Sequence, residues 1–434
     1  MKFLLVNIKK PRTALAIAAL AAAGPACAQL GLPRLPLPQQ IGPVELERLR
    51  RPAEQLLQRA PLPELGGLRL DTVRALLRRH PALLEADPRG EPAVRGEVLA
   101  WSPSTAALEA AAQAGLVVVR EEALAALHER LVVLRVPAGA ATAELVERLR
   151  VLDPQGIYDF NHVYTGSGAA PGVPEGRGAA QGVRGVGLVD GGVDAAHPVF
   201  GGAAVTRWGC GGRHVPDAHG TAVAALMVGR SEVLRGAAPE AALYAADVYC
   251  GDPAGGAADR IAAALDWLAR QQVGVINISL VGPPNALLGR AVAAMQERGH
   301  LLVAAVGNDG PGAPPLYPAS YRGVVGVTGV DRRGKPLPEA ARGPQVMFAA
   351  PGSQMVSAAP GAPPYRQVRG TSFAAPIVAA LLAGRLPKPD RLAAAAALKD
   401  LAAEAAGGKP GSVSNETGYG IVGASLRTDP SALR

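Results

Sequence analysis

The second half of the chain alternates short apolar runs with longer segments that have helical periodicity. The apolar runs are rich in Val, Ile, Leu and Ala, and they occupy residues 185–190, 242–249, 274–280, 300–307 and 323–330. The helical segments occupy residues 220–230, 259–272 and 286–299. Continuous apolar strands separated by helices are typical of a parallel sheet that is covered on both faces. We therefore predict an α/β fold with a parallel sheet flanked by helices, in a chain whose 434 residues allow two or three domains.

Four polar residues stand where such a fold collects its reactive groups, at the carboxyl ends of strands and the amino ends of helices. Asp190 ends a strand, His219 directly precedes a helix, and Asn308 follows a strand. Ser372 opens the apolar helix at residues 369–384. Each has an ordinary explanation when taken alone: a solvated carboxylate, a structural histidine, a turn asparagine and a serine that caps its helix.

Taken together, the four residues provide what acyl transfer requires. A serine hydroxyl becomes a nucleophile when a base takes its proton, and His219 can act as that base for Ser372. Asp190 can orient the imidazole through its other nitrogen. Asn308 and the backbone N–H of Ser372 can donate to the oxyanion, helped by the positive potential of the helix end. The sequence therefore predicts a nucleophilic serine rather than a capping serine.

The glycines near Asp190 do not form a dinucleotide-binding loop. That motif requires G-x-G-x-x-G after a strand, whereas Gly185 and Gly187 lie inside the predicted strand and the sixth position is Asp190. We therefore expect the chemistry to require no cofactor.

Composition and periodicity divide the first half of the chain into four parts. Residues 1–28 are predicted to be a signal peptide, residues 29–95 a Pro- and Arg-rich helical segment, and residues 165–182 a Gly- and Pro-rich linker. Between them, residues 96–164 predict a small α+β domain of the split βαβ (ferredoxin-like) type. Its alternating strands and helices are expected at residues 96–102, 104–115, 116–121, 130–137, 141–152 and 156–164. The α/β domain would then comprise residues 183–434.

The first 28 residues have the features of an export signal. A basic start is followed by the apolar residues 14–23, and Ala26-Cys27-Ala28 fits a cleavage site between small residues. The apolar run is short for a membrane span, and an uncleaved anchor is the alternative. We therefore predict a secreted or periplasmic protein of a bacterial cell envelope, which meets the membrane only during export.

The formal net charge of +8 arises largely from basic residues in the first part of the chain. The part after residue 165 has no dense cluster of Lys and Arg with interleaved aromatic residues. We therefore expect no nucleic-acid partner.

Removal of the signal peptide leaves two cysteines, Cys210 and Cys250. In an exported chain an even number of cysteines predicts disulfide pairing, here one bond. The alternative is two unpaired buried thiols.

The chemical motifs resemble those of the subtilisin-like serine proteases (subtilases, the peptidase S8 family) over about residues 185–426. The segment LVDGGVDAAHP resembles the family's Asp motif, HGTAVAAL its His motif and GTSFAAP its Ser motif, in the family's chain order. The resemblance implies a serine endopeptidase with a triad of Asp190, His219 and Ser372. Asn308, which ends AAVGN, would complete the oxyanion hole. A monomer that acts on protein or peptide substrates is expected.

The same resemblance implies how a substrate binds. The segment GVINISLVGP would pair with an extended substrate through Ser279, Leu280, Val281 and Gly282. Leu316 would lie at the base of the primary specificity pocket and narrow the preference to small or medium apolar side chains; the alternative is a core leucine near that pocket. Ala222 and Ala225 replace residues usual in the His motif, which bears on substrate preference rather than on activity.

The α+β domain resembles the N-terminal propeptide of the family, which implies an intramolecular inhibitor that is cut off near residues 164–170. Many subtilases bind structural calcium, but Asp194, Asp217 and Asp252 lack the spacing of a dedicated calcium loop, so no metal site is predicted. Two other functions are the alternatives. One is a catalytically inactive binding protein of the same fold, and the other is an exported serine esterase, which would place its serine first in chain order.

Overall fold

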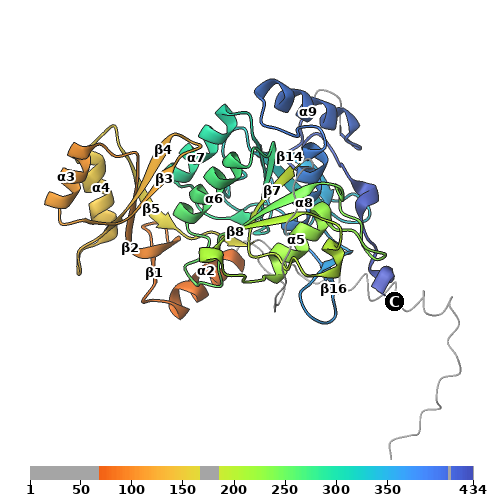
Figure 1. The fold of residues 1–434 in the computed structure, drawn as a ribbon, viewed down its shortest axis with the longest axis horizontal. Coiled ribbons are helices and arrows are strands. Elements are labelled where there is room, and N and C mark those ends of the chain that lie inside the picture. Colours follow the sequence, from red (N-terminus) through yellow and green to blue (C-terminus); the bar gives the residue numbers. More distant parts are fainter. Residues whose placement is uncertain (1–67, 167–184, 409–411, 434) are drawn as a thin grey trace, which may run out of the picture. The chain divides into compact units, whose positions relative to one another are not determined.

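The computed structural model describes residues 68–166, 185–408 and 412–433 (Figure 1). These residues belong to one unit, which comprises residues 63–434. The predicted signal peptide at residues 1–28 lies outside the described residues. So do most of the 29–95 segment and all but the first two residues of the 165–182 linker.

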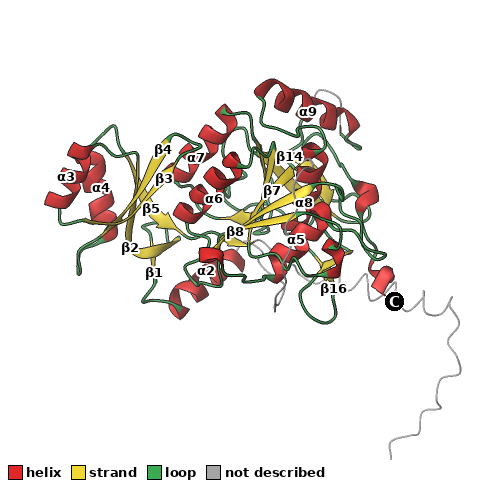
Figure 2. Ribbon diagram, viewed as in Figure 1, coloured by secondary structure: helices red, strands yellow, loops and turns green. Residues whose placement is uncertain are grey.

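A seven-stranded parallel sheet forms the centre of the second half of the chain (Figure 2). Its strand order is β14-β13-β12-β10-β7-β9-β8, and each neighbouring pair is parallel. The strands are β7 (Gly185–Asp190), β8 (Val205–Gly209), β9 (Ala242–Asp247), β10 (Val275–Ile278), β12 (Leu301–Ala305), β13 (Val325–Val330) and β14 (Val346–Pro351). The predicted parallel sheet is confirmed. The sequence did not identify β8, because this edge strand is only half-buried and has no continuous apolar run, nor did it identify β14.

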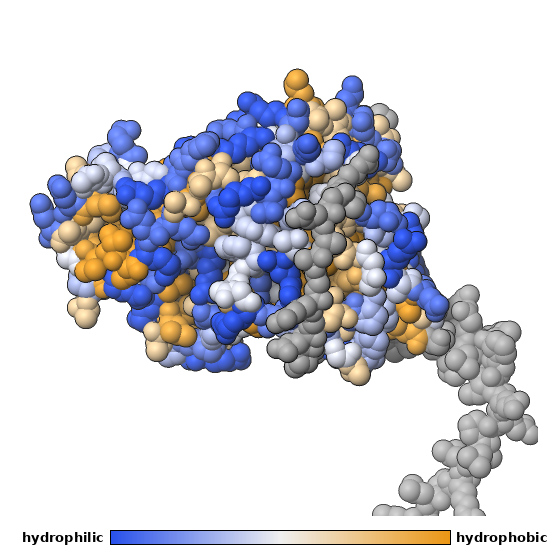
Figure 3. Space-filling model, viewed as in Figure 1, coloured by the Kyte–Doolittle hydropathy of each residue, from blue (hydrophilic) through white to orange (hydrophobic). Residues whose placement is uncertain are grey.

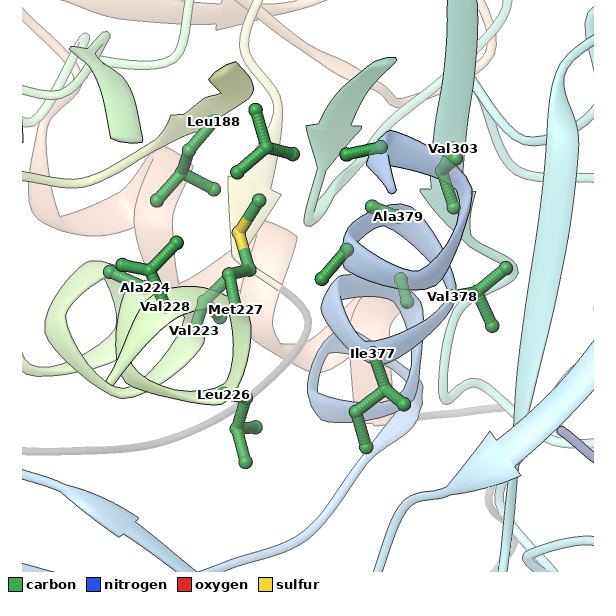
Figure 4. Close-up of a cluster of buried hydrophobic side chains, with 14 of the residues drawn as sticks. Leu188, Val223, Ala224, Leu226, Met227, Val228, Val303, Ile377, Val378 and Ala379 are labelled. Atoms are coloured by element: carbon green, nitrogen blue, oxygen red, sulfur yellow. The ribbon is translucent and has the colours of Figure 1, made fainter. Parts of the chain in front are cut away.

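Helices cover both faces of this sheet (Figure 1). One face carries α5 (Ala218–Val228), α8 (Thr371–Ala383) and α9 (Arg391–Glu404), and the other carries α6 (Ala258–Arg270) and α7 (Ala286–Glu297). Figure 4 shows how the first face is filled: Met227 of α5 points toward Leu188 of β7 in the space between α5 and α8, while Val303 of β12 and Val378 lie on the other side of α8. Helix α8 is buried on nearly every side, because its many alanines allow close contact with the sheet and with α5.

The first described part of the chain forms a five-stranded antiparallel sheet with two helices. Its strands are β1 (Leu84–Ala86), β2 (Pro92–Trp101), β3 (Val117–Leu124), β4 (Glu129–Arg135) and β5 (Ile157–His162), and its helices are α3 (Thr105–Gln113) and α4 (Thr142–Leu152). β2 is central and pairs with β1, β4 and β5, while β3 pairs with β4. Alternate residues point to opposite faces: Val98 and Val132 pack toward α3 and α4, whereas Leu99 and Val133 pack toward α6 and α7.

This sheet begins earlier than the sequence indicated, since β1 and the start of β2 precede residue 96. The helical periodicity of the 29–95 segment continues only through α2 (Leu68–Arg79). Pro81 disfavours helical geometry at the preceding residue, His80, and so the helix ends and Leu84–Ala86 becomes a strand.

The antiparallel sheet is fixed to the outer side of α6 and α7 by polar contacts at one turn. In the turn between β3 and β4, the backbone N–H groups of Ala126 and Leu127 donate to Asp266 Oδ1 of α6 at 2.8 and 3.2 Å. Arg298, at the end of α7, donates to the carbonyl oxygens of the same two residues at 2.8 and 2.6 Å. The backbone N–H and carbonyl groups of these two residues are therefore satisfied by side chains of the α/β domain.

On the face shown in Figure 3, the largest apolar patch lies over the antiparallel sheet and its helices, at the left of the view. None of the helices in the described part of the chain is both long and apolar enough to span a lipid bilayer.

Candidate active site

Asp190 and His219 form a buried hydrogen-bonded pair. Asp190 is the last residue of β7 and His219 is the second residue of α5, and His219 Nδ1 lies 2.8 Å from Asp190 Oδ1. Asp217 caps α5 by accepting from the backbone N–H groups of His219 and Gly220 at 2.8 and 3.0 Å. The cap fixes the start of the helix, and so it fixes the direction in which the imidazole projects.

The electrostatics of this pair suit a general base. Burial of His219 lowers the pKa of its imidazole. The negative charge of Asp190, with a smaller contribution from Asp217, more than compensates, so the pKa is raised overall. Burial likewise raises the pKa of Asp190, while His219 and the N–H of Gly191 favour its charged form. His219 Nε2 is buried and has no hydrogen-bond partner among the described residues. One ring nitrogen therefore contacts the carboxylate while the other can accept a proton.

Ser372 and Asn308 are held together by the segment before α8. The backbone N–H of Thr371 donates to Asn308 Oδ1 at 3.0 Å, and Thr371 Oγ1 accepts from the backbone of Gly307 at 3.2 Å. Because Oδ1 of Asn308 is the acceptor in this contact, its Nδ2 is the atom of the amide that can donate to an oxyanion. The residue that caps α8 is Gly370, without a side-chain cap. Ser372 is therefore the second residue of α8 and not its N-cap.

Further contacts place the start of α8 beside Ser279 and His219. Ser279 Oγ donates to the Ser372 carbonyl at 3.1 Å. The ring of Phe373, the next residue of α8, has its centroid 5.3 Å from that of His219. The four residues singled out by the sequence thus converge at the carboxyl edge of the parallel sheet.

An extended segment of the chain crosses this site. β6 (Thr165–Gly166) pairs antiparallel with β11 (Leu280–Val281), and the preceding Val163 forms a bridge with Ala257 on its other side. A methyl group at Gly166 would lie 3.8–3.9 Å from the ring of His219. The first two residues of the predicted linker therefore form a strand. The extended segment lies in a groove between β11 and Ala257, and it pairs with the backbone on both sides.

The predicted substrate-binding residues have different surroundings. Leu280 and Val281 pair with β6, while Ser279 is buried and donates to Ser372. Gly282 exchanges two backbone hydrogen bonds with Tyr317 at 2.9 and 3.0 Å. Leu316 is buried next to Gly307, where a methyl group would lie 2.5 Å from Leu316 Cδ1.

The sequence analysis missed Gly307 and Thr371, which position Asn308. Gly307 has a φ of 100°, a conformation that favours glycine. The dipeptide Gly307-Asn308 directly after an apolar strand is the sequence signal that could have revealed the role of Gly307.

A charged contact near the site comes from α2, which the sequence did not connect with function. Arg69 forms a two-pronged ion pair with Glu91, and its Nε lies 3.8 Å from Asp309 Oδ2. Asp309 directly follows Asn308. Burial raises the pKa of Asp309 to about 6, and Arg69 opposes that rise.

The two cysteines are bonded to each other, and the acidic residues considered for calcium have protein partners. Cys210 and Cys250 form a disulfide with a Cα–Cα distance of 5.2 Å, and Cys210 Sγ lies 3.1 Å from Asp247. Asp252 pairs with Arg260. Asp194 accepts from a backbone N–H two residues later, and Asp217 caps α5. Among the described residues, metal-type ligands cluster at Cys210, Asp247 and Cys250 and at Asp190, Asp217 and His219; the first cluster contains the disulfide and the second the candidate pair.

Comparison with known proteins places the second half of the chain in a defined group. The sequence profile of the Subtilase family matches residues 184–420. The minor extracellular protease Epr of Bacillus subtilis is 34% identical over 135 residues, which are 30% of this chain and 21% of that protein. Subtilisin DY of Bacillus licheniformis is 31% identical over 230 residues, 50% of this chain and 82% of that protein. The chain spans less than half the length of the first of these relatives.

A solved structure has the same fold over a larger part of the chain. Fervidolysin from Fervidobacterium pennivorans, a keratinolytic enzyme related to subtilisin, aligns with a TM-score of 0.61 and 21% identity. The alignment covers 79% of this chain and 62% of that structure. Because the identity is low, this similarity concerns the fold alone.

Proposed function

This chain belongs to the subtilase family, and we propose that it is an exported serine endopeptidase made as a self-inhibited precursor. Ser372 Oγ attacks the carbonyl carbon of a peptide bond while His219 Nε2 takes the hydroxyl proton. Asp190 stabilises the imidazolium that forms. Asn308 Nδ2 and the backbone N–H of Ser372 donate to the oxyanion of the tetrahedral intermediate.

The intermediate collapses when His219 returns its proton to the leaving amine, which breaks the C–N bond and leaves an acyl-enzyme on Ser372. A water molecule then attacks the ester with His219 again as the base, and the second product leaves with a carboxylate. No step requires a metal or an organic cofactor. Calcium could contribute only to stability, and Asp194, Asp217 and Asp252 have protein partners.

One observation carries the proposal: an extended segment lies between two strands with its Gly166 beside His219. A groove that hydrogen-bonds an extended backbone on both sides binds a peptide rather than a small ester. The same observation supports the precursor. Residues 84–166 lead from the antiparallel sheet into the groove, and they would block it until the chain is cut near residues 164–170.

Leu316 gives the enzyme its primary specificity under this proposal. Its buried side chain beside Gly307 supports a shallow pocket that accepts small or medium apolar side chains. Profiling with a peptide library tests this, and a strong preference for Phe or Lys at the cleaved residue would contradict it.

The decisive experiment compares the wild-type chain with Ser372→Ala by intact-mass analysis after expression in a host that exports the protein. We expect the wild type to lose the signal peptide and everything up to a cut near residues 164–170. The variant should remain at the full length that follows signal removal. A variant that matures unaided in a protease-free preparation would contradict self-processing.

Two chemical assays separate the alternative functions. A fluorophosphonate probe should label the processed wild type, whereas an inactive binding protein would not react. Casein should be degraded in a Ser372-dependent manner, while an esterase would hydrolyse a small ester and spare casein.

A further inference from the structure

A cavity of about 510 Å³ lies beside β8, which ends the parallel sheet on one side. Neither Ser372 nor His219 is among the described residues that line it. Val205 and Arg207 of β8 both line the cavity and, two positions apart on a strand, they point to the same face of the sheet. The cavity is therefore separate from the candidate active site, and it needs its own explanation.

The wall of this cavity opposite β8 is held in place by hydrogen bonds. His214 Nε2 lies 3.0 Å from the carbonyl oxygen of Val193. Gly192 forms a parallel bridge with Pro216, and its carbonyl accepts from the backbone N–H of Asp217 at 2.7 Å. These contacts fasten the segment before α5 to the segment that follows β7. The cavity is therefore preorganised, and a ligand would not have to order its walls.

Arg207 brings an unsatisfied donor to this cavity. Its Nη1 is buried, and none of the described residues offers it a hydrogen-bond partner. A buried donor without an acceptor is costly, and the cost is greater when the donor is charged. The guanidinium group matches the oxygens of a carboxylate, a sulfate or a phosphate. An anionic oxygen from outside the chain would therefore satisfy Arg207.

The charges around the cavity also favour an anion. Arg207 and the exposed Arg213 line it, and Asp247 is the one carboxylate among the described residues that do so. Two guanidinium groups and one carboxylate leave a net positive charge even when the imidazole of His214 is neutral. A negatively charged ligand is therefore attracted to this cavity, and a cation is repelled.

We propose that this cavity binds an oxyanion, with Arg207 Nη1 donating to one of the anion's oxygens. Arg213 contributes positive charge at the exposed rim. The same chemistry fits a tetrahedral anion, such as sulfate or phosphate, and the carboxylate of a small organic acid. The site does not depend on the chemistry of Ser372, so it stands or falls independently of the proposed protease activity.

The experiment measures the binding of radiolabelled sulfate by equilibrium dialysis at pH 8. It uses the full chain with Ser372→Ala, which cannot digest itself. We expect one sulfate per chain with a Kd of about 1 mM or below, because two or three charge-assisted hydrogen bonds supply that affinity. Arg207→Met keeps the length of the side chain but removes its charge and donors, and it should weaken binding about tenfold or more. Arg230→Met removes an exposed arginine that pairs with Glu240, and this matched control should bind sulfate like the parent.

Two further arms of the dialysis sharpen the result. The pKa of Asp247 is about 6, so its carboxylate is charged at pH 8 and repels an anion in the cavity. Asp247→Asn removes that charge and should tighten sulfate binding about two- to tenfold. Displacement of the labelled sulfate by unlabelled phosphate would identify a tetrahedral anion as the ligand, and stronger displacement by acetate would identify a carboxylate. Either displacement supports the site.

A stability measurement distinguishes a ligand-binding arginine from a structural one. In sodium chloride without sulfate, the thermal midpoint of Arg207→Met should equal or exceed that of its Ser372→Ala parent, because the variant no longer buries an unpaired charge. A lower midpoint, or a variant that does not fold, would show that the guanidinium has a structural role and would overturn the site. Absence of sulfate binding by the parent, or equal binding by Arg207→Met, would overturn it as well.

Discussion

Asp190 and Asp247 end the neighbouring strands β7 and β9 at the same position of the ladder, yet they have different partners. Asp190 Oδ1 lies 2.8 Å from His219, whereas Asp247 Oδ2 lies 3.1 Å from the sulfur of Cys210. Burial raises the pKa of both carboxyl groups, to about 6 for Asp247. The two carboxyl groups thus share their position in the ladder, but Asp190 is buried while Asp247 is half-buried, and only Asp190 contacts an imidazole.

The parallel sheet thus places carboxylates at its carboxyl edge, and the segment that follows each strand determines which groups the carboxylate contacts. Asp247 Oδ1 accepts from the backbone N–H groups of Tyr249 and Cys250, both at 2.9 Å, and so it shapes the turn that carries the disulfide. Asp190 instead faces a helix that begins with a histidine. We therefore expect one carboxylate to control the reaction rate and the other to support the fold.

The largest expected effect separates the two carboxylates directly. Asp190→Asn removes the charge that stabilises the His219 imidazolium and should slow self-processing about 10,000-fold. Asp247→Asn keeps the Oδ1 acceptor and should change the rate less than about threefold. The rate is measured as the loss of full-length chain by intact mass. Similar losses of rate in both variants would show that the two carboxylates are functionally equivalent.

The second prediction concerns what Asp247 supports. Replacement of both Cys210 and Cys250 with serine opens a loop defined by a sequence separation of 40 residues. The chain-entropy model then predicts a loss of about 4 kcal/mol from the free energy of unfolding. Denaturant unfolding should be measured in a Ser372→Ala chain, which cannot digest itself. An unchanged midpoint would mean that the disulfide adds nothing to stability.

Apolar patterning made the parallel sheet and its covering helices predictable, because strands buried on both faces have no polar alternation. The half-buried edge strand β8 lacks that pattern and was missed. The four polar residues of the site were identifiable because each follows a strand or opens a helix. The contact of Arg69 with Asp309 was not identifiable, because it joins distant segments and no local pattern records it.

The third prediction uses the pH dependence of activity. A general base must be neutral, and the pKa of His219 is raised, chiefly by Asp190 and further by Asp217. Activity should therefore fall, as the pH is lowered, at a higher pH than it would for an isolated imidazole of pKa about 6.5. Asp217→Asn keeps the cap of α5 but removes a charge, so the fall should move to lower pH.

Asp247→Asn is the matched control for that pH profile. The charge of Asp247 does not contribute to the raised pKa of His219, so this variant should lose activity at the same pH as the wild type. The measurement is kcat/KM of the processed enzymes between about pH 5 and 9. If both variants shifted the pH profile equally, the proposed difference between the surroundings of Asp190 and Asp247 would be contradicted.

The smallest expected effect concerns a third carboxylate, Asp309, which follows β12 and is paired by Arg69 from α2. Arg69→Ala removes this contact and the ion pair with Glu91. After self-processing, the cleaved N-terminal part should therefore dissociate sooner, and the delay before activity appears should be about two- to fivefold shorter. Because the pKa of Asp309 is about 6, the carboxylate is charged above that pH and the attraction is lost below it. The effect should therefore be larger at pH 8 than at pH 5. Arg74→Ala, in an exposed ion pair of the same helix, should leave the lag unchanged, and equal lags for both variants would assign Arg69 no part in holding the precursor.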